Sequence, residues 1–281
     1  MAIQKTEAFI LKTQPLRTSS LIVTSFSRSF GKLKGVVKGV RKEGLPHPSA
    51  FEPFTLDEII FYEKTRSDLH LISEVSILES FEGLRSELQA LATAYYLCEL
   101  VDQLTEWHDP HESIFELLHF AFQWLPFVDS PFLSRVFEMR LLSAVGLLPN
   151  LAGCLGCGEK NPHRVYFSIR QGGMFCSNCR KRAPESAALS AETLEVLRVL
   201  TGERMAEGEW EGLRVKMREL SKDKSLIGEV GNLVDRFIVE RLGKRVVSRR
   251  FLNQVRSLKD HKRVGSKQGL SPQNSESLRQ E

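Results

Sequence analysis

Four cysteines constrain the fold of this chain more than any other feature of its sequence. They form two C-x2-C pairs separated by eighteen residues: Cys154, Cys157, Cys176 and Cys179. Two tight turns of this kind bring four thiolates to one ion, the tetrahedral all-sulfur arrangement of structural zinc sites. Catalytic zinc sites keep one position open and usually include His or a carboxylate, so the pattern predicts one structural Zn²⁺ ion.

The residues around the cysteines suit this interpretation. Glycines flank the first pair, and Gly172-Gly173 allow the chain to reverse before the second. Arg164 and Arg170 lie between the pairs, and positive charge favours thiolates. Two alternatives stay open at this point: two disulfides, or a degenerate loop without metal. Disulfides fit less well, because the rest of the chain has an intracellular character.

Length and charge suggest the general class of the protein. A chain of 281 residues predicts two domains, with three small modules as an alternative. Residues 241–281 contain eleven Lys/Arg against three Asp/Glu, a net charge of +8, whereas the first 240 residues carry −4. A basic end indicates a polyanionic partner or a basic tail. No secretory signal and no uncharged apolar run of about 18 residues is found, so we expect a cytoplasmic protein without a membrane segment.

Residues 1–79 show the pattern of a small β-domain. About five short runs rich in β-branched and aromatic residues are separated by turn signals, with a Gly/Pro-rich break at residues 44–53. A closed barrel is the economical way to bury so many short strands. The five-stranded OB-fold is the leading candidate, and an SH3-like barrel is an alternative.

Residues 80–252 are expected to form a helical domain, interrupted by the zinc module at about 151–185. Apolar residues at helical spacing predict helices over 86–101, 112–125, 132–145, from 190 onward and over 226–242. Helical spacing also favours core packing over base stacking for the aromatic residues of these segments, and a core position for Cys98. Residues 253–281 lack apolar periodicity and predict a disordered basic tail. The expected fold class is therefore α+β.

A basic cluster in the barrel region is the main candidate for nucleic-acid binding. Lys32, Lys34 and Lys38 alternate with apolar residues, so a strand would place them on one face, where they can follow phosphates. The alternative is an ordinary solvated strand face. The candidate DNA-binding residues here are Arg28, Lys32, Lys34, Lys38, Arg41 and Lys42.

A second basic cluster follows the predicted helix over 226–242. Arg241 and Lys244 are explained by the favourable interaction of cations with a helix C-terminus. Arg249 and Arg250 lie beyond that helix, so we add them as candidate DNA-binding residues.

Catalytic signatures are missing from the sequence. It contains no G-x4-G-K-[ST], no G-x-S-x-G and no H-E-x-x-H, and the deaminase pattern that pairs H-x-E with P-C-x-x-C is also absent. We therefore expect a protein that binds rather than one that breaks bonds, with a dispersed catalytic site as the alternative.

Several short motifs occur in the order in which they occur in a known family. From about residue 5 to residue 252 the chain resembles the family of the bacterial recombination mediator RecO. The motifs are Gly31-Lys32-Leu33, Lys38-Gly39-Val40-Arg41, Pro53-Phe54-Thr55, Ala94-Tyr95-Tyr96-Leu97, Phe137-Glu138-Met139-Arg140-Leu141-Leu142, the cysteine pairs with Gly172-Gly173, and Ser248-Arg249-Arg250-Phe251-Leu252.

The resemblance implies an OB barrel, a helical bundle and an inserted zinc module. It also implies a protein that binds single- and double-stranded DNA, anneals complementary strands and works with RecR. Such proteins help RecA load onto DNA coated by single-stranded DNA-binding protein, whose acidic C-terminal tail they contact. A nucleoid-associated location follows from this role. The alternative function is a zinc-ribbon scaffold for protein interactions in transcription or replication.

Overall fold

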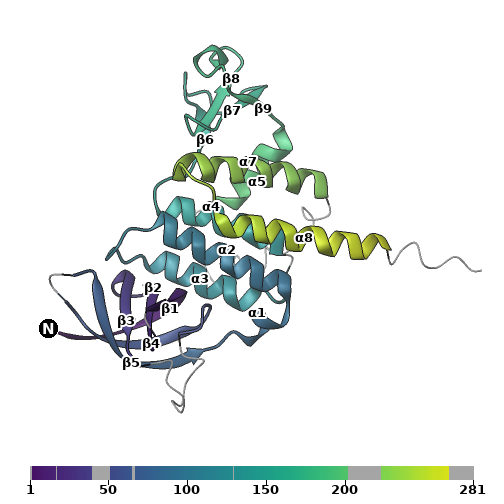
Figure 1. Cartoon of the computed structure of the whole chain (residues 1–281). Coiled ribbons are helices and arrows are strands. Elements are labelled where there is room, and N and C mark those ends of the chain that lie inside the picture. The colour runs from purple at the N-terminus through teal and green to yellow at the C-terminus, as the bar shows by residue number, and fades with distance from the viewer. Residues whose placement is uncertain are drawn as a thin grey trace, which may run out of the picture.

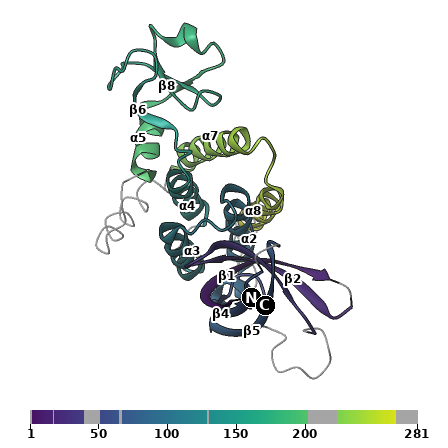
Figure 2. The same cartoon turned by 90° about the vertical axis from the view of Figure 1, so that its left-hand side faces the viewer.

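The computed structural model describes residues 2–16, 18–39, 51–64, 67–128, 130–201 and 223–265. Its parts lie in a row: a β-barrel at one end, helices in the middle and a small four-stranded sheet at the other end (Figure 1). A view turned by a quarter shows the same order, so the helices separate the barrel from the small sheet (Figure 2). A barrel followed by a helical region is the α+β class that the sequence predicts.

Five strands close the barrel in the order β1-β2-β3-β5-β4. β3 and β5 run parallel, and the other neighbouring strands are antiparallel. This connectivity is that of the OB-fold, so the OB prediction is confirmed and the SH3-like alternative is wrong. The strands are β1 (Ile3–Leu16), β2 (Ser20–Ser27), β3 (Gly31–Val37), β4 (Leu56–Tyr62) and β5 (Leu69–Glu79).

The alternation of residues in β3 sorts them between the two faces of the barrel. Leu33 and Val37 point inward and join the apolar interior, whereas Lys32, Lys34 and Lys38 lie on the outer face. Gly35 also faces inward, where a Cβ atom would lie 2.6 Å from the side chain of Ile72 on β5. Glycine at this position therefore allows β3 and β5 to approach each other and close the barrel.

The helices begin and end where local signals place them. Ser190 caps α5, because its Oγ accepts a hydrogen bond from the backbone N–H of Thr193 at 3.0 Å. Gly146 and Gly243 follow the ends of α4 and α7 with φ values of 72° and 65°, a conformation that favours glycine. The helices are α1 (Glu82–Ser86), α2 (Leu88–Leu104), α3 (Glu112–Trp124), α4 (Ser130–Ala144), α5 (Ala191–Leu200), α7 (Lys224–Leu242) and α8 (Val247–Gly265).

The barrel and the helices share one apolar core. The ring centroid of Phe9 on β1 lies 4.8 Å from that of Phe115 and 5.5 Å from that of Phe122, both on α3. Phe26 on β2 is fully buried in the same core, so it packs against protein and is not available to bases. Core positions are likewise confirmed for Cys98 and for Phe115, Phe122, Phe132 and Phe137.

The C-terminal helix α8 corrects one expectation. The sequence predicted a disordered tail from residue 253, but α8 continues to Gly265. Leu252 and Val255 are buried three positions apart, which gives this polar helix a narrow apolar stripe. The N-terminus of α8 is held by Glu99 of α2, whose carboxylate accepts hydrogen bonds from the backbone N–H groups of residues 247 and 248. Residues 266–281 of the predicted tail lie outside the described residues.

None of the helices in the described part of the chain has the length and apolar character of a membrane span. Each of them is either too short or too polar to cross a bilayer.

Candidate metal centre and nucleic-acid interface

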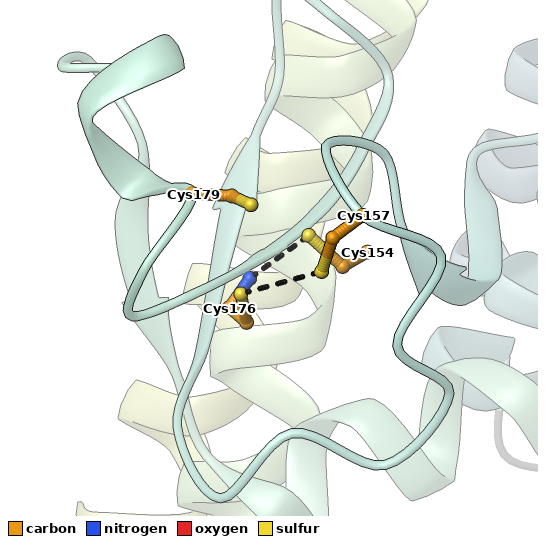
Figure 3. A group of neighbouring side chains, drawn as sticks. All are labelled: Cys154, Cys157, Cys176 and Cys179. Carbon is orange, nitrogen blue, oxygen red and sulfur yellow. Dashed lines mark hydrogen bonds between the residues drawn. The ribbon is translucent and has the colours of Figure 1, made fainter.

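The four cysteines meet in the small sheet. It consists of β6 (Asn150–Cys154), β7 (Val165–Ser168), β8 (Gly173–Cys176) and β9 (Ala187–Leu189), in the order β6-β8-β7-β9. Cys154 and Cys176 end two neighbouring strands, and each is followed by a turn that carries the second cysteine of its pair. All four Sγ atoms lie within 4.8 Å of one another and face a common point (Figure 3).

The arrangement of the sulfurs suits a single metal ion. A tetrahedral site with metal–sulfur bonds of about 2.3 Å requires sulfurs about 3.8 Å apart. The distance from Cys157 Sγ to Cys176 Sγ is 3.8 Å. All five cysteines of the chain are free, so neither of the two alternative disulfides is present. The four thiols therefore fit a closed metal site, which is the site that the sequence predicted.

The backbone prepares Cys154 for a thiolate. Burial raises the pKa of this thiol, but hydrogen bonds from backbone N–H groups outweigh burial and lower the pKa to about 6. Two of these donors are the N–H groups of Gly156 and Cys176, each 3.3 Å from the sulfur. N–H donors of this kind stabilise negative charge on sulfur, which is the form that a metal binds.

Glycine is required in the first cysteine turn. A Cβ atom on Gly156 would lie 2.7 Å from the Cβ atom of Cys179, so any larger residue would push the two turns apart. Gly158, which follows the first pair, has a φ of 79°, in the left-handed region. The two glycines let the turns come close enough to share an ion.

Two arginines attach the small sheet to the helices. Arg241 at the end of α7 donates to the carbonyl oxygens of Ile169 and Arg170, at 3.0 and 3.2 Å. Arg198 on α5 donates twice to the carbonyl oxygen of Leu151, at 3.1 and 3.0 Å. The module is thus joined to the helical domain by hydrogen bonds to its backbone.

Among the predicted barrel residues, Lys34 and Lys38 have the environment expected of a phosphate-binding surface. Both lie on the outer face of the β3 segment, where Lys34 is partly exposed and Lys38 is exposed. Lys34 pairs across the sheet with Thr24 and Leu69, which carry no charge. Arg41 and Lys42 lie outside the described residues.

Lys32 is placed differently, although it lies on the same face of β3. Its side chain is only 6% exposed, and its Nζ atom donates to the carbonyl oxygens of Asp102 and Thr105 at 2.5 and 2.6 Å. Burial lowers the pKa of this ammonium group. Lys32 therefore connects the barrel to the C-terminal end of α2.

Arg28 also connects the barrel to the helices. Its guanidinium pairs with Glu7 at 2.9 Å, with Glu116 at 2.7 Å and with Glu112, and it lies 4.1 Å from the ring centroid of Phe115. Burial favours a lower pKa, but the hydrogen bonds to Glu116 and Glu7 prevail and raise the pKa of Arg28. Three carboxylates around one guanidinium leave little attraction for a phosphate.

Of the two candidate arginines of α8, one is paired inside the protein and the other is exposed. Arg249 pairs with Asp235 at 2.5 Å, and its guanidinium lies 4.9 Å from the ring centroid of Tyr96. Arg250, the next residue, is exposed. Helical geometry turns successive residues by about 100°, so one faces the core and the other faces solvent.

Comparison with known proteins identifies the family. The model of the N-terminal domain of recombination protein O matches residues 1–81, and the model of its C-terminal domain matches residues 85–250. This chain belongs to the RecO family. The resemblance seen in the sequence motifs is thereby confirmed.

Curated relatives support membership of the RecO family over most of the chain. A protein of Syntrophus aciditrophicus named DNA repair protein RecO is 33% identical over 262 residues, which cover 92% of this chain and 98% of the relative. Proteins of the same name from Desulforamulus reducens and Bacillus pumilus are 29% and 27% identical, and each match covers 91% of this chain. The two RecO models meet between residues 81 and 85, close to where β5 ends and α1 begins.

An ionic network inside the helical domain of this RecO-family chain was missed by the sequence reasoning. Glu138 on α4 is fully buried and lies 2.6 Å from Arg135 Nη2, and its carboxylate accepts a hydrogen bond from the hydroxyl of Tyr96 at 2.8 Å. Arg135 also pairs with Asp235 on α7, which binds Arg249 on its other oxygen. The i,i+3 spacing of Arg135 and Glu138 was the available signal, but it is equally typical of exposed pairs.

Proposed function

We propose that this RecO-family chain is a DNA-binding mediator of recombination and repair. In this proposal it binds single- and double-stranded DNA and anneals complementary strands. Together with RecR it helps RecA to load onto single-stranded DNA coated by single-stranded DNA-binding protein, whose acidic C-terminal tail it contacts. This role places the protein in the cytoplasm, close to the nucleoid. The observation that carries the proposal is the match to both RecO models along nearly the whole chain.

We propose a smaller DNA-binding surface than the full set of candidate residues, and the exposure and internal partners of their side chains support this choice. Lys34 and Lys38 are assigned to phosphate contacts, since they lie on the outer face of an OB barrel, and Arg250 is assigned to a contact from α8. Arg41 and Lys42 follow Lys38 in the chain and remain candidates. Arg28, Lys32 and Arg249 already have internal partners, so we assign them a supporting role.

We propose that the protein acts by binding and positioning, without breaking covalent bonds. A mediator of this kind requires phosphate contacts that form and dissociate along a strand, and electrostatic contacts of exposed lysines have this property. The sequence lacks the catalytic motifs that a hydrolase or nucleotidyl transferase of a common class would show.

We propose that the metal is one structural Zn²⁺ ion. Four thiolates complete its tetrahedral shell, so no position is left for substrate or water. The residues packed around the cysteines are few: Phe175, Ala183 and Tyr166. Metal binding, which contributes roughly 10–16 kcal/mol in zinc-finger peptides, would therefore supply most of the stability of this module.

The proposed DNA surface is tested by charge reversal. Fluorescence anisotropy with labelled single-stranded DNA over a salt series would compare the wild type with the Lys34→Glu/Lys38→Glu double variant. Loss of two phosphate contacts should lower the log–log salt slope by about 1.4, because each contact to a single strand contributes about 0.7.

The matched control is Lys160→Glu/Lys181→Glu, which reverses two exposed charges in the metal module at the far end of the molecule. It should retain the wild-type slope. Wild-type affinity of the barrel variant at moderate salt would overturn the assignment of Lys34 and Lys38. Annealing of complementary strands by the same preparation then distinguishes a mediator from a general DNA-binding protein.

The second candidate function is a scaffold that binds a protein partner through the metal module. The observation that favours it is a cavity of about 680 Å³ between the small sheet and α7, lined by apolar residues that include Phe167, Leu189 and Leu233 and by charged residues of both signs. In this case DNA affinity would be weak and insensitive to the charge of the barrel lysines. The anisotropy experiment therefore separates the two candidates.

A further inference from the structure

Trp107 lies beside the proposed DNA surface, in the connection between α2 and α3. This connection runs parallel to the first half of β3, where residues 32 and 107 form a β-bridge and the N–H of His108 donates to the carbonyl oxygen of Lys32 at 3.1 Å. β5 pairs with β3 only over residues 34–37. Residues 107 and 108 thus continue the sheet along the part of β3 that β5 leaves uncovered.

The position of Lys32 determines which face of the Trp107 ring is exposed. The Nζ atom of Lys32 lies 4.6 Å from the ring centroid, a cation–π contact. Lys32 is 5% exposed, whereas Trp107 is 42% exposed. Because the ammonium group is buried, it lies on the protein side of the ring. The opposite face of the ring is therefore the one that solvent reaches.

The backbone that carries the ring is held by the two residues that follow Trp107. Gly31 approaches the connection so closely that a Cβ atom would lie 2.1 Å from the carbonyl oxygen of Asp109. His108 has a φ of 58°, and its ring lies 5.5 Å from that of His70 on β5. A ring that is already ordered loses little conformational freedom when a ligand stacks on it.

The charges around Trp107 give a direction to a bound strand. Lys34 lies two residues beyond Lys32 on the outer face of β3, about 7 Å further along the strand, and Lys38 continues this row. Glu106 and Asp109 flank Trp107 in the chain and are exposed, so they disfavour phosphates on their side. A strand that places a base on Trp107 must therefore run its phosphates past the lysines of β3.

We propose that Trp107 is a stacking platform for an unpaired base of single-stranded DNA whose phosphates contact Lys34 and Lys38. The inference rests on the proposed function and deepens it, since it separates single strands from duplexes. In a duplex each base is already stacked and paired, so its face is not available to the ring. Phosphate contacts contribute to the affinity for both single strands and duplexes, whereas stacking on Trp107 contributes only to the affinity for single strands.

The test uses the full chain and two labelled oligonucleotides of equal length, one of thymidines and one with an abasic backbone. Trp107→Leu keeps an apolar cover over Lys32 but removes the aromatic face. We expect it to lower affinity for the thymidine strand about fivefold or more, to leave affinity for the abasic strand unchanged and to leave the salt slope unchanged. The control is Phe127→Leu, which changes an 80% exposed aromatic residue beyond the opposite end of α3 and should have no effect.

Intrinsic fluorescence gives a second measurement that does not depend on a truncated side chain. Thymidine strands should quench the wild-type protein, and Trp107→Phe should lose that part of the quenching while it retains a ring and part of the affinity. Equal affinity of wild type and Trp107→Leu for the thymidine strand would overturn the inference. An equal loss for both oligonucleotides would also overturn it, because it would show a structural role. If the wild type binds neither strand in a salt-dependent way, the proposed function itself fails.

Discussion

A buried lysine such as Lys32 is stable only when its ammonium group has partners. Its two carbonyl acceptors come from the end of α2, and each is a main-chain dipole that helix geometry leaves without an intrahelical donor. The ammonium group therefore satisfies acceptors that would otherwise need water. Leaving a buried polar group unsatisfied costs about 1–3 kcal/mol, so this contact stabilises the junction of barrel and helix.

Asp57 on β4 carries its carboxyl group in the barrel interior, where a negative charge is unfavourable. It is fully buried, and burial raises the pKa of its carboxyl group to about 6, against opposing contributions from the hydroxyl of Thr55 and the backbone N–H of Phe51. In the unfolded chain the pKa is 3.8. Between these two values the folded protein holds a proton that the unfolded chain has lost, so the free energy of unfolding falls as pH rises.

The fall of the free energy of unfolding with rising pH predicts how the effect of Asp57→Asn depends on pH. The free energy of unfolding of the variant, relative to wild type, should rise by about 2 kcal/mol between pH 4 and pH 7.5, because only the wild type must ionise a buried carboxyl group. Urea unfolding at a series of pH values measures this difference. A constant difference across the range would contradict it, and Glu58→Gln at the neighbouring, partly exposed position is the matched control.

At the residue scale, the sequence predicted which face of β3 each lysine occupies but not what covers that face. Alternation is a local property, so it placed Lys32 and Lys34 together correctly. The residues that cover Lys32 lie some seventy positions later in the chain, in α2 and the connection after it. The same long-range contact is what makes Trp107 part of the barrel surface, and no local signal indicates it.

At the scale of elements, the metal module has only a small apolar cluster of its own around the cysteines. Its four strands have between three and five residues each, and short strands with a small core are marginal without a cross-link. The cysteines link the turns after β6 and β8, which are the positions where the chain would otherwise fray.

Replacement of a single ligand should therefore unfold this module alone. Cys176→Ser should lose its metal, lower the solubility of the protein and increase hydrogen exchange over residues 150–189, before any change in DNA specificity. Metal content by atomic emission and peptide-resolved exchange measure these effects. Cys98→Ala is the control, because it removes a thiol that lies in the helical core. A soluble, fully folded Cys176→Ser protein without metal would contradict this view.

Elements were predicted well where a local signal ends them. Ser190 acts through its side-chain hydroxyl, and the glycines at 146 and 243 act through their own backbone conformation, so the sequence alone located these three helix boundaries. Helix α8 was not predicted, because its apolar stripe is narrow and its stability comes from packing on α2. Periodicity detects wide apolar faces more easily than narrow ones.

At the scale of the whole molecule, Arg28 joins the barrel to the helices through three carboxylates. Its three carboxylate partners come from β1 and α3, and its guanidinium lies against an aromatic ring of the shared core. A network of charges in a fixed geometry contributes more than an isolated surface pair.

Arg28→Gln is expected to weaken this junction. The free energy of unfolding should fall by about 1 kcal/mol at low salt, and the difference should shrink as salt is added, because the lost contacts are partly exposed ion pairs. Chemical denaturation at two salt concentrations measures this, with Lys5→Gln at a more exposed pair as the control. A large loss of DNA affinity with unchanged stability would assign Arg28 to DNA contact instead.

The packing of α8 on α2 has a consequence for synthesis on the ribosome. Glu99 leaves the ribosome about 150 residues before its partners Val247 and Ser248. At a synthesis rate of about 10 residues per second, α8 emerges roughly 15 s after α2. The apolar side of α2 that α8 covers in the folded protein stays exposed for that time. During that interval the nascent chain presents a hydrophobic surface that the finished protein hides. Translation speed and chaperone access, as well as the final contacts, therefore influence the yield of native protein.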